Sequence, residues 1–256
     1  DGTHAITLFV NGANEGQSQR SDWSLANDKF SIGQEYDSGL VTSNFWTGEI
    51  DEARVWTTAR SQADIQRDMY QPLIGTEPEL LAYWPMDDAD GASTIIDAAT
   101  GVYNGTSHGG PASIRSTVPP GSNSSEYRNT PLGPSGYSLW FDGENDYIEA
   151  DSVCAALETA NSMSFSAWVK PTGDESRSPI LWISDPAGDG QIELEYQNNT
   201  NRFVFATTGY QQVSNSTHTF ESEQWHNITL TIGEVADNLR TVKLYVNGQL
   251  EIEDEF

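Results

Sequence analysis

Several acidic residues are placed where they could bind a divalent cation, and Asp51 is the first of them. It lies in the run from Glu49 to Trp56, whose alternation predicts a β-strand. In a regular strand Asp51 shares a face with Ala53 and Val55, and a carboxylate on an apolar face needs a metal ion or hydrogen-bond donors. Calcium, a hard cation that prefers oxygen ligands, suits such a residue. The alternatives are that Asp51 accepts backbone N–H bonds or pairs with an arginine.

A second oxygen-rich segment has the sequence Asp-Gly-Glu-Asn-Asp, in which Asp142, Asn145 and Asp146 are candidate calcium ligands. The alternative is a plain acidic β-turn, because Asp, Asn and Gly are common turn residues. The acidic residues between 87 and 90 resemble a calcium loop only loosely. They lack the Asp-x-Asp-x-Asp-Gly spacing and the bidentate Glu that complete such a loop.

Aromatic side chains could bind sugars by stacking. The chain has eight Trp residues, and most of them are expected in the core because they fall on the buried side of strands. Trp182 and Tyr210 lie near Gly-, Asp- or Gln-rich segments, and they are the candidate ligand-binding residues at the surface. The single cysteine, Cys154, has apolar neighbours and is expected to be a small buried residue. The four histidines are not spaced as zinc ligands.

The charge of the chain bears on its partners. The 256 residues include 12 basic and 38 acidic ones, giving a formal net charge of −26. This acidity opposes binding to DNA, RNA or anionic lipid, since phosphate contacts need Lys and Arg. No apolar run reaches about 18 residues, so no membrane insertion is expected. Scattered carboxylates indicate a solvated surface in a saline or calcium-rich medium.

The elements that must position these residues are β-strands. The alternating runs are rich in Phe, Tyr, Trp, Val and Ile, and Gly, Asn, Asp and Pro bound them, which predicts an all-β sandwich. They span residues 6–10, 164–169, 191–196, 202–206, 227–232 and 242–246.

Helical signals are few. A helix is expected at about Ser61 to Tyr70, where Ser61 can cap it and Asp64 stands at the third following position. A second short helical piece is expected near Val153 to Thr159. The stretch from Ser107 to Gly136 is rich in Gly, Pro, Ser and Asn, and it is expected to be a long loop or an insertion.

The chain contains an internal repeat. Residues 5–12, Ala-Ile-Thr-Leu-Phe-Val-Asn-Gly, match residues 241–248, Thr-Val-Lys-Leu-Tyr-Val-Asn-Gly, at an offset of 236. Each is a strand that runs into an Asn-Gly hairpin turn. Either these are two unrelated hairpins with the same turn chemistry, or the sequence is one period of a longer tandem array.

Several motifs together resemble the concanavalin A-like, laminin G-like jelly-roll family. In the family's own order they are residues 81–87, 97–106, 139–148, 165–171, 224–226, 244–248, 48–56 and 63–65. The resemblance implies an all-β, concanavalin A-like jelly-roll sandwich of two antiparallel sheets with one short helix. In related jelly rolls the residue at the position of Asp51 often helps to bind structural Ca²⁺, together with backbone carbonyls near the opening strand.

The order of these motifs departs from the family. Residues 1–75 correspond to the C-terminal segment of the jelly roll, and residues 80–256 correspond to its N-terminal and central segment, with 107–136 as the loop or insertion. Three arrangements would avoid open sheet edges. The early segment completes its own chain as a circular permutant, it completes a neighbouring copy by strand complementation, or the sequence is a window of a continuous array. The repeated hairpin argues against simple permutation, because two copies would compete for one place.

The same resemblance allows an enzyme to be considered. Laminarinase-like glycosidases share this sandwich and carry Glu-x-Asp-x-x-Glu on one strand, and retaining hydrolysis needs two carboxylates about 5–5.5 Å apart. Here Glu49 and Asp51 fit the start of the pattern, but Arg54 stands at its final position. The sequence therefore predicts that the protein is not an enzyme.

Taken together, the sequence favours a non-catalytic extracellular module for adhesion or carbohydrate binding, with structural calcium. Its expected partners are a carbohydrate or surface ligand and neighbouring copies of the same repeat. The acidity and the tandem layout favour a secreted or cell-surface protein of a bacterium from a saline environment. The alternative is a structural subunit of an extracellular filament or extender array, held together by strand complementation between neighbouring copies.

Overall fold

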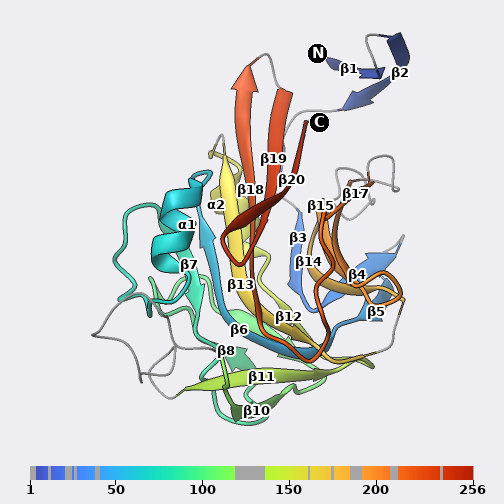
Figure 1. Ribbon diagram of the computed structural model, residues 1–256. Helices are drawn as coiled ribbons and strands as arrows, with labels where there is room; N and C mark the ends of the chain where they lie inside the picture. The colour runs from blue at the N-terminus through green and yellow to red at the C-terminus, as the bar shows by residue number, and fades with distance from the viewer. Residues whose placement is uncertain are drawn as a thin grey trace.

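The structure is a computed structural model, and it describes residues 4–10, 13–20, 25, 28–37, 41–118, 136–160, 162–173, 176–184, 192–207, 213–236 and 239–255. These residues form two large antiparallel sheets that face each other, with short helices at the periphery (Figure 1). Within this described part, no helix is long and apolar enough to cross a membrane.

The first large sheet has the strand order β10-β11-β6-β13-β18-β19-β20, and β7 pairs with β6 beside this path. Its strands are β6 (Thr47–Trp56), β7 (Leu80–Trp84), β10 (Ala112–Arg115), β11 (Tyr137–Asp142), β13 (Met163–Pro171), β18 (His226–Ala236), β19 (Leu239–Val246) and β20 (Gln249–Glu255).

The second large sheet has the order β17-β16-β15-β14-β3-β12-β9-β8. Its strands are β3 (Lys29–Ile32), β8 (Thr94–Ile95), β9 (Gly105–His108), β12 (Tyr147–Glu149), β14 (Ser178–Ser184), β15 (Ile192–Gln197), β16 (Arg202–Thr207) and β17 (Val213–Asn215).

The remaining elements lie outside the two large sheets. The hairpin of β1 (His4–Val10) and β2 (Ala13–Arg20) forms a sheet of its own, as does the hairpin of β4 (Gln34–Asp37) and β5 (Val41–Phe45). The helices in the described part are α1 (Gln62–Asp68) and α2 (Ser152–Leu157).

The early part of the chain supplies a central strand to each large sheet. β6 lies between β11 and β13, with Ile50 opposite Leu139 on one side and Val55 opposite Phe165 on the other. β3 lies between β14 and β12, and its Ile32 stands opposite Leu181 of β14 and Ile148 of β12. The chain's own early segment therefore completes both large sheets, while β1 and β2 pair in a sheet of their own. The division of the chain at residues 75 and 80 remains a prediction.

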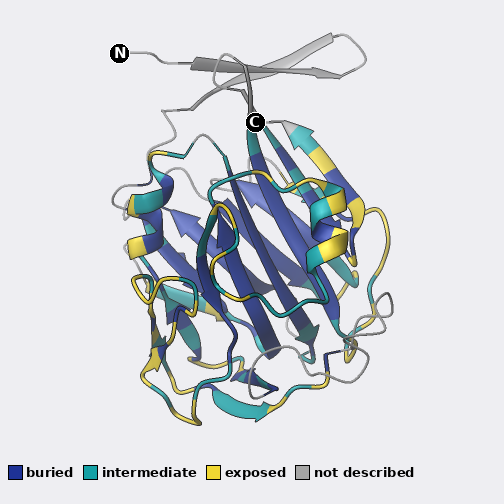
Figure 2. Cartoon of the chain, turned by 90° about the vertical axis from the view of Figure 1, so that its left-hand side faces the viewer, coloured by how far each residue is buried: buried dark blue, intermediate teal, exposed yellow. Residues whose placement is uncertain are grey.

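The core lies between the two sheets, and aromatic side chains cross it. Phe30 of β3 lies 6.1 Å from Trp84 of β7 and 6.4 Å from Phe165 of β13, measured between ring centroids. All three side chains are buried, and such tilted and edge-on pairs add about 0.5–1.5 kcal/mol each beyond the burial of their area. Figure 2 shows the buried residues concentrated on the strands, while exposed residues lie mostly on the connections and on the outer sides of the helices.

The expected elements largely agree with the structure. The fold class is confirmed, and the six alternating runs are the strands β1, β13, β15, β16, β18 and β19. Helix α1 begins as expected, because the Ser61 hydroxyl accepts a hydrogen bond from the Asp64 backbone N–H at 3.2 Å. The expected second helical piece is α2, so the single helix implied by the family resemblance was one too few.

The expectation of one long loop from Ser107 to Gly136 is wrong for its first part. Ser107 and His108 belong to β9, and Ala112–Arg115 form β10, which pairs with β11. Backbone pairing with a neighbouring strand outweighs the local turn composition here. Residues 119–135 lie outside the described part.

The close approach of β6 to the end of β13 requires glycine at position 48. Gly48 has φ +139°, and a Cβ at this position would overlap the Lys170 carbonyl oxygen. We expect Gly48→Ala to lower the free energy of unfolding by roughly 2–4 kcal/mol, measured by urea unfolding. Gly91→Ala is the matched control, because Gly91 also has a positive φ (+67°), but among the described residues beyond its chain neighbours no atom lies within 4 Å of its Cβ position. Equal losses in the two variants would contradict this account.

Candidate functional site

The candidate calcium residue Asp51 lies at a bulge in β6. The register between β6 and β13 shifts between Ser166 and Trp168, and Glu52 has a positive φ of +55°. Ile50 and Ala53 both face the core, so the two residues between them, Asp51 and Glu52, both lie on the outer face. The expectation that Asp51 shares a face with Ala53 was therefore wrong, because the bulge interrupts the two-residue period.

Asp51 is nevertheless fully buried, because later parts of the chain cover this outer face. Its Oδ2 atom accepts a hydrogen bond from the Ser116 hydroxyl at 2.5 Å. Its Oδ1 atom is buried and has no hydrogen-bond partner among the described residues. Burial raises the pKa of Asp51 well above its usual range, and the neighbouring carboxylates of Glu52 and Asp87 raise it further. A buried carboxylate of this kind is stabilised by a proton or by a cation.

The neighbouring acidic residue, Glu52, is paired. Its carboxylate accepts a hydrogen bond from Arg54 at 2.6 Å and from the Tyr83 hydroxyl at 2.8 Å. Arg54 also donates to the backbone carbonyls of Asp68 and Gln71, at 3.0 and 2.8 Å. This arginine therefore neutralises Glu52, and Asp51 has no arginine partner among the described ion pairs.

Glu49, the first residue of the pattern considered for hydrolysis, is also engaged. Its carboxylate pairs with Lys170 at 3.0 Å and accepts a hydrogen bond from the Ser138 hydroxyl at 2.9 Å. Only 5% of Glu49 and 1% of Glu52 are exposed. These contacts give both carboxylates ion-pair and hydrogen-bond partners within the fold.

The second candidate calcium segment follows β11. Asp142 is exposed, and its backbone N–H donates to Asp146 Oδ2 at 3.0 Å, as in an acidic turn. Asp146 is buried, and burial together with the Asp142 charge raises its pKa. A Cβ at Gly109 would meet Asn145 Oδ1, Asp146 Oδ1 and the Asn145 carbonyl oxygen at once. The Gly109 backbone therefore packs closely against three neighbouring oxygen atoms, which are of the type that calcium prefers as ligands.

These two candidate segments do not form one site. Asp142 pairs with Thr47, which is four residues from Asp51 along β6, a separation of about 13 Å in an extended strand. Within the described part, no three acidic, His or Cys side chains gather closely enough to hold a metal. Calcium at either place would therefore also need Ser, Asn, backbone carbonyl or water oxygens, which this metal accepts.

The candidate sugar-binding residue Trp182 lies on the outer face of the second sheet, but it is covered. Only 1% of its surface is exposed, and Tyr36 of β4 packs edge-on against it at 5.1 Å. Its indole Nε1 is buried without a partner among the described residues. A sugar could reach it only if β4 moved, so its role remains a prediction. Tyr210 lies outside the described residues.

A buried charge cluster that the sequence analysis did not identify lies beside Trp182. Glu193 stands opposite Trp182 in the register of β15 and β14. Arg177 pairs with Glu35, Glu193 and Glu195 at 2.6, 2.7 and 2.7 Å. Burial raises the pKa of Glu193 to about 9, and its contact with Glu35 contributes. In the sequence, the signal that could have identified this cluster is the alternation of Glu with apolar residues in 192–196, Ile-Glu-Leu-Glu-Tyr.

The cluster predicts a pH dependence of stability. Since its pKa is raised from 4.5 to about 9, Glu193 binds its proton more tightly in the folded state, and stability falls as the pH rises through this interval. We expect the free energy of unfolding, measured by urea unfolding from pH 5 to pH 9, to fall less steeply in Glu193→Gln than in the natural chain. Glu144→Gln, which changes an exposed residue, is the control. Identical slopes for Glu193→Gln and the natural chain would contradict the cause proposed here.

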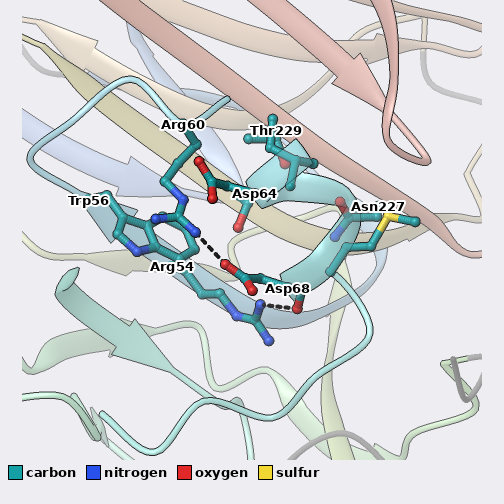
Figure 3. A pocket seen from close by; sticks show the side chains of 10 residues that line it. Arg54, Trp56, Arg60, Asp64, Asp68, Asn227 and Thr229 are labelled. Carbon is teal, nitrogen blue, oxygen red and sulfur yellow. Dashed lines mark hydrogen bonds and ion pairs between the residues drawn. The ribbon is translucent and has the colours of Figure 1, made fainter. Parts of the chain in front are cut away.

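A small pocket lies between α1 and the outer face of the first sheet (Figure 3). Arg60 lies over the Trp56 ring at 5.0 Å and forms an ion pair with Asp68. Arg54 Nε, Trp56 Nε1 and Asn227 Oδ1, which belong to residues lining the pocket, are buried and lack a hydrogen-bond partner among the described residues. Two donors and one acceptor around so small a space suit hydrogen bonds to ordered water better than an organic ligand.

Comparison with known families agrees with this architecture. A laminin G family model, described as the concanavalin A-like lectin/glucanases superfamily, matches residues 1–66 and 142–255. No curated protein and no solved structure matches the chain. The matched residues include both central strands β3 and β6 and most of the strands that pair with them. The chain belongs to this laminin G-like family of the concanavalin A-like superfamily.

Proposed function

We propose that the protein is a non-catalytic extracellular module for adhesion or carbohydrate binding, stabilised by structural calcium. The family, whose description includes lectins, supports a carbohydrate-binding or adhesion-type module. The contacts of Glu49 and Glu52 with Lys170 and Arg54 support the absence of catalysis on β6. Extracellular location is part of the proposal, since calcium is abundant there.

The observation that carries the proposal is the buried Oδ1 atom of Asp51, which has no hydrogen-bond partner among the described residues. The Ser116 hydroxyl that donates to Asp51 carries no charge, and the neighbouring Glu52 carboxylate is negative. Neither of them balances a negative charge on the Asp51 carboxylate. A calcium ion bound by Asp51, with oxygens from the segments that cover it, would supply a balancing positive charge. Asn145 and Asp146 would hold a second ion, because their oxygens, of the type that calcium prefers, lie close beside Gly109.

Calcium is expected to stabilise the fold. At free calcium a hundredfold above the Kd, linkage adds about 2.7 kcal/mol, which corresponds to a rise in Tm of about 5–10 °C for a chain of this size. Differential scanning calorimetry in millimolar calcium and in chelator measures the shift. Asp51→Asn should lose most of the calcium-dependent Tm shift. Asp146→Asn tests separately the second ion proposed at Asn145 and Asp146. Glu221→Gln, an exposed control, should keep the full shift.

An unchanged Tm of the natural chain in calcium and in chelator would exclude structural calcium. A shift that survives in Asp51→Asn but disappears in Asp146→Asn would assign the ion to the turn that follows β11. A shift that survives in both variants would contradict both assignments.

Carbohydrate binding is expected to depend on calcium. A broad glycan array probed with the natural chain, in calcium and then in chelator, should show binding only in calcium. Tyr210→Ala should weaken that binding by up to about tenfold without changing the Tm, because an aromatic stacking contact contributes about 0.5–1.5 kcal/mol. No binding to any glycan on the array in calcium would count against the carbohydrate part of the proposal.

A further inference from the structure

The hairpin β1–β2 repeats the hairpin β19–β20 in structure as well as in sequence. Leu8 pairs with Gly16 as Leu244 pairs with Ile252, at the same offset of 236 residues. The pairs at the two ends of the hairpins also correspond. Next to the turn, Val10 pairs with Ala13 as Val246 pairs with Gln249. At the far end, Ala5 pairs with Gln19 as Thr241 pairs with Glu255. Both hairpins shift register at the same step, between residues 8 and 9 and between residues 244 and 245. Equivalent pairing with an equivalent bulge indicates that both hairpins are built for the same place in a sandwich.

The place that β19–β20 occupies is specific. β19 pairs with β18 along its length and buries Val242, Leu244 and Val246 in the core. At the turn, Asn247 donates to the Asn227 carbonyl at 2.7 Å and accepts from the Asn227 backbone N–H at 3.0 Å. These bonds fix the hairpin against the start of β18.

Two further contacts hold this hairpin. The Gly248 carbonyl accepts hydrogen bonds from Gln62 and Gln66 of α1, at 2.9 and 2.7 Å. Glu251 accepts from Thr217 at 2.6 Å and from the His218 backbone N–H at 3.0 Å. The place is therefore defined by β18, α1 and the segment that follows β17.

The sequence of β1–β2 carries the residue types that this place requires. Ile6, Leu8 and Val10 stand where β19 has its three buried residues, and an Asn-Gly turn follows in both. Glu15 stands at the position of Glu251. Among the described strands, β1 and β2 pair with each other and with no other strand (Figure 1), so the second edge of β1 has no neighbour there.

One difference explains why the later hairpin occupies the place. Ile252 of β20 is 5% exposed, and the corresponding residue of β2 is Gly16, which has no side chain to bury. β19 also follows β18 directly in the chain, so its effective concentration at this edge is high. The early hairpin is the weaker competitor for β18 of its own chain.

We propose that β1–β2 is a donor hairpin that takes the place of β19–β20 against β18 of a second copy of this chain. Donation from one copy to the next is a head-to-tail contact, which extends into an array unless it closes into a ring. This association does not involve the proposed calcium or carbohydrate sites, so its test is independent of the tests of those sites.

The test is covalent trapping in the full chain. In a Cys154→Ala background, Thr7→Cys is combined with Thr231→Cys, because donation places residue 7 at the position of Lys243, opposite Thr231. Oxidation at increasing protein concentration should give a ladder of disulfide-linked chains on a non-reducing gel. The control combines Thr7→Cys with Thr106→Cys, an exposed residue of the other sheet, and it measures chance collisions. A ladder no stronger than this control, or linkage only within one chain, would overturn the proposal.

A matched pair of variants tests the competition itself. Leu244→Ala in the trapping background should increase the ladder severalfold, because it weakens the resident hairpin, whereas Leu8→Ala should decrease it severalfold, because it weakens the donor. If Leu244→Ala unfolds, Leu244→Val and Leu8→Val give the same comparison with a smaller loss of packing. Equal effects of the two substitutions would overturn the proposal.

Discussion

The structure depends on the insertion of two early strands, β3 and β6, into the middle of sheets built by the rest of the chain. Each has a hydrogen-bonded neighbour on both edges. Without them both sheets would divide into two parts with open edges, and the aromatic core around Phe30 would lose one wall. The sandwich is therefore a single cooperative unit in which residues more than a hundred positions apart are direct neighbours.

The central position of β6 also explains the chemistry of its polar residues. The core covers one face of this strand, and α1 with the segments around Ser116 covers the other, so its charged groups are removed from water. Glu49 and Glu52 are neutralised by Lys170 and Arg54. Asp51 has one hydroxyl partner and two repelling carboxylates nearby. Asp51 has no ion-pair partner among the described residues of this mostly buried strand, and this is the physical basis of our proposal of calcium there.

Much of the architecture could be predicted from the sequence, because strand runs such as residues 164–169 combine strict alternation with high β-propensity. The face of Asp51 could not, since a bulge at Glu52 changes the two-residue period without a Gly or Pro to mark it. The burial of Trp182 could not either, because it depends on Tyr36, whose contact arises only from the tertiary fold. The ion pair of Glu35 with Arg177 likewise joins residues 142 positions apart, which no local pattern contains. By contrast, the similarity of the two hairpins was visible in the sequence as a repeat, and the structure adds that their registers agree.

The central claim is that β3 and β6 are integral strands of the sandwich. Hydrogen–deuterium exchange followed by mass spectrometry tests it most directly, on the natural chain at low concentration. The account predicts that peptides covering residues 29–32 and 47–56 exchange as slowly as those of β13 and β14, because these amides open only in global unfolding. Fast exchange of β3 and β6 beside slow exchange of β13 and β14 would contradict it, since the early strands would then not be part of the folded sheets.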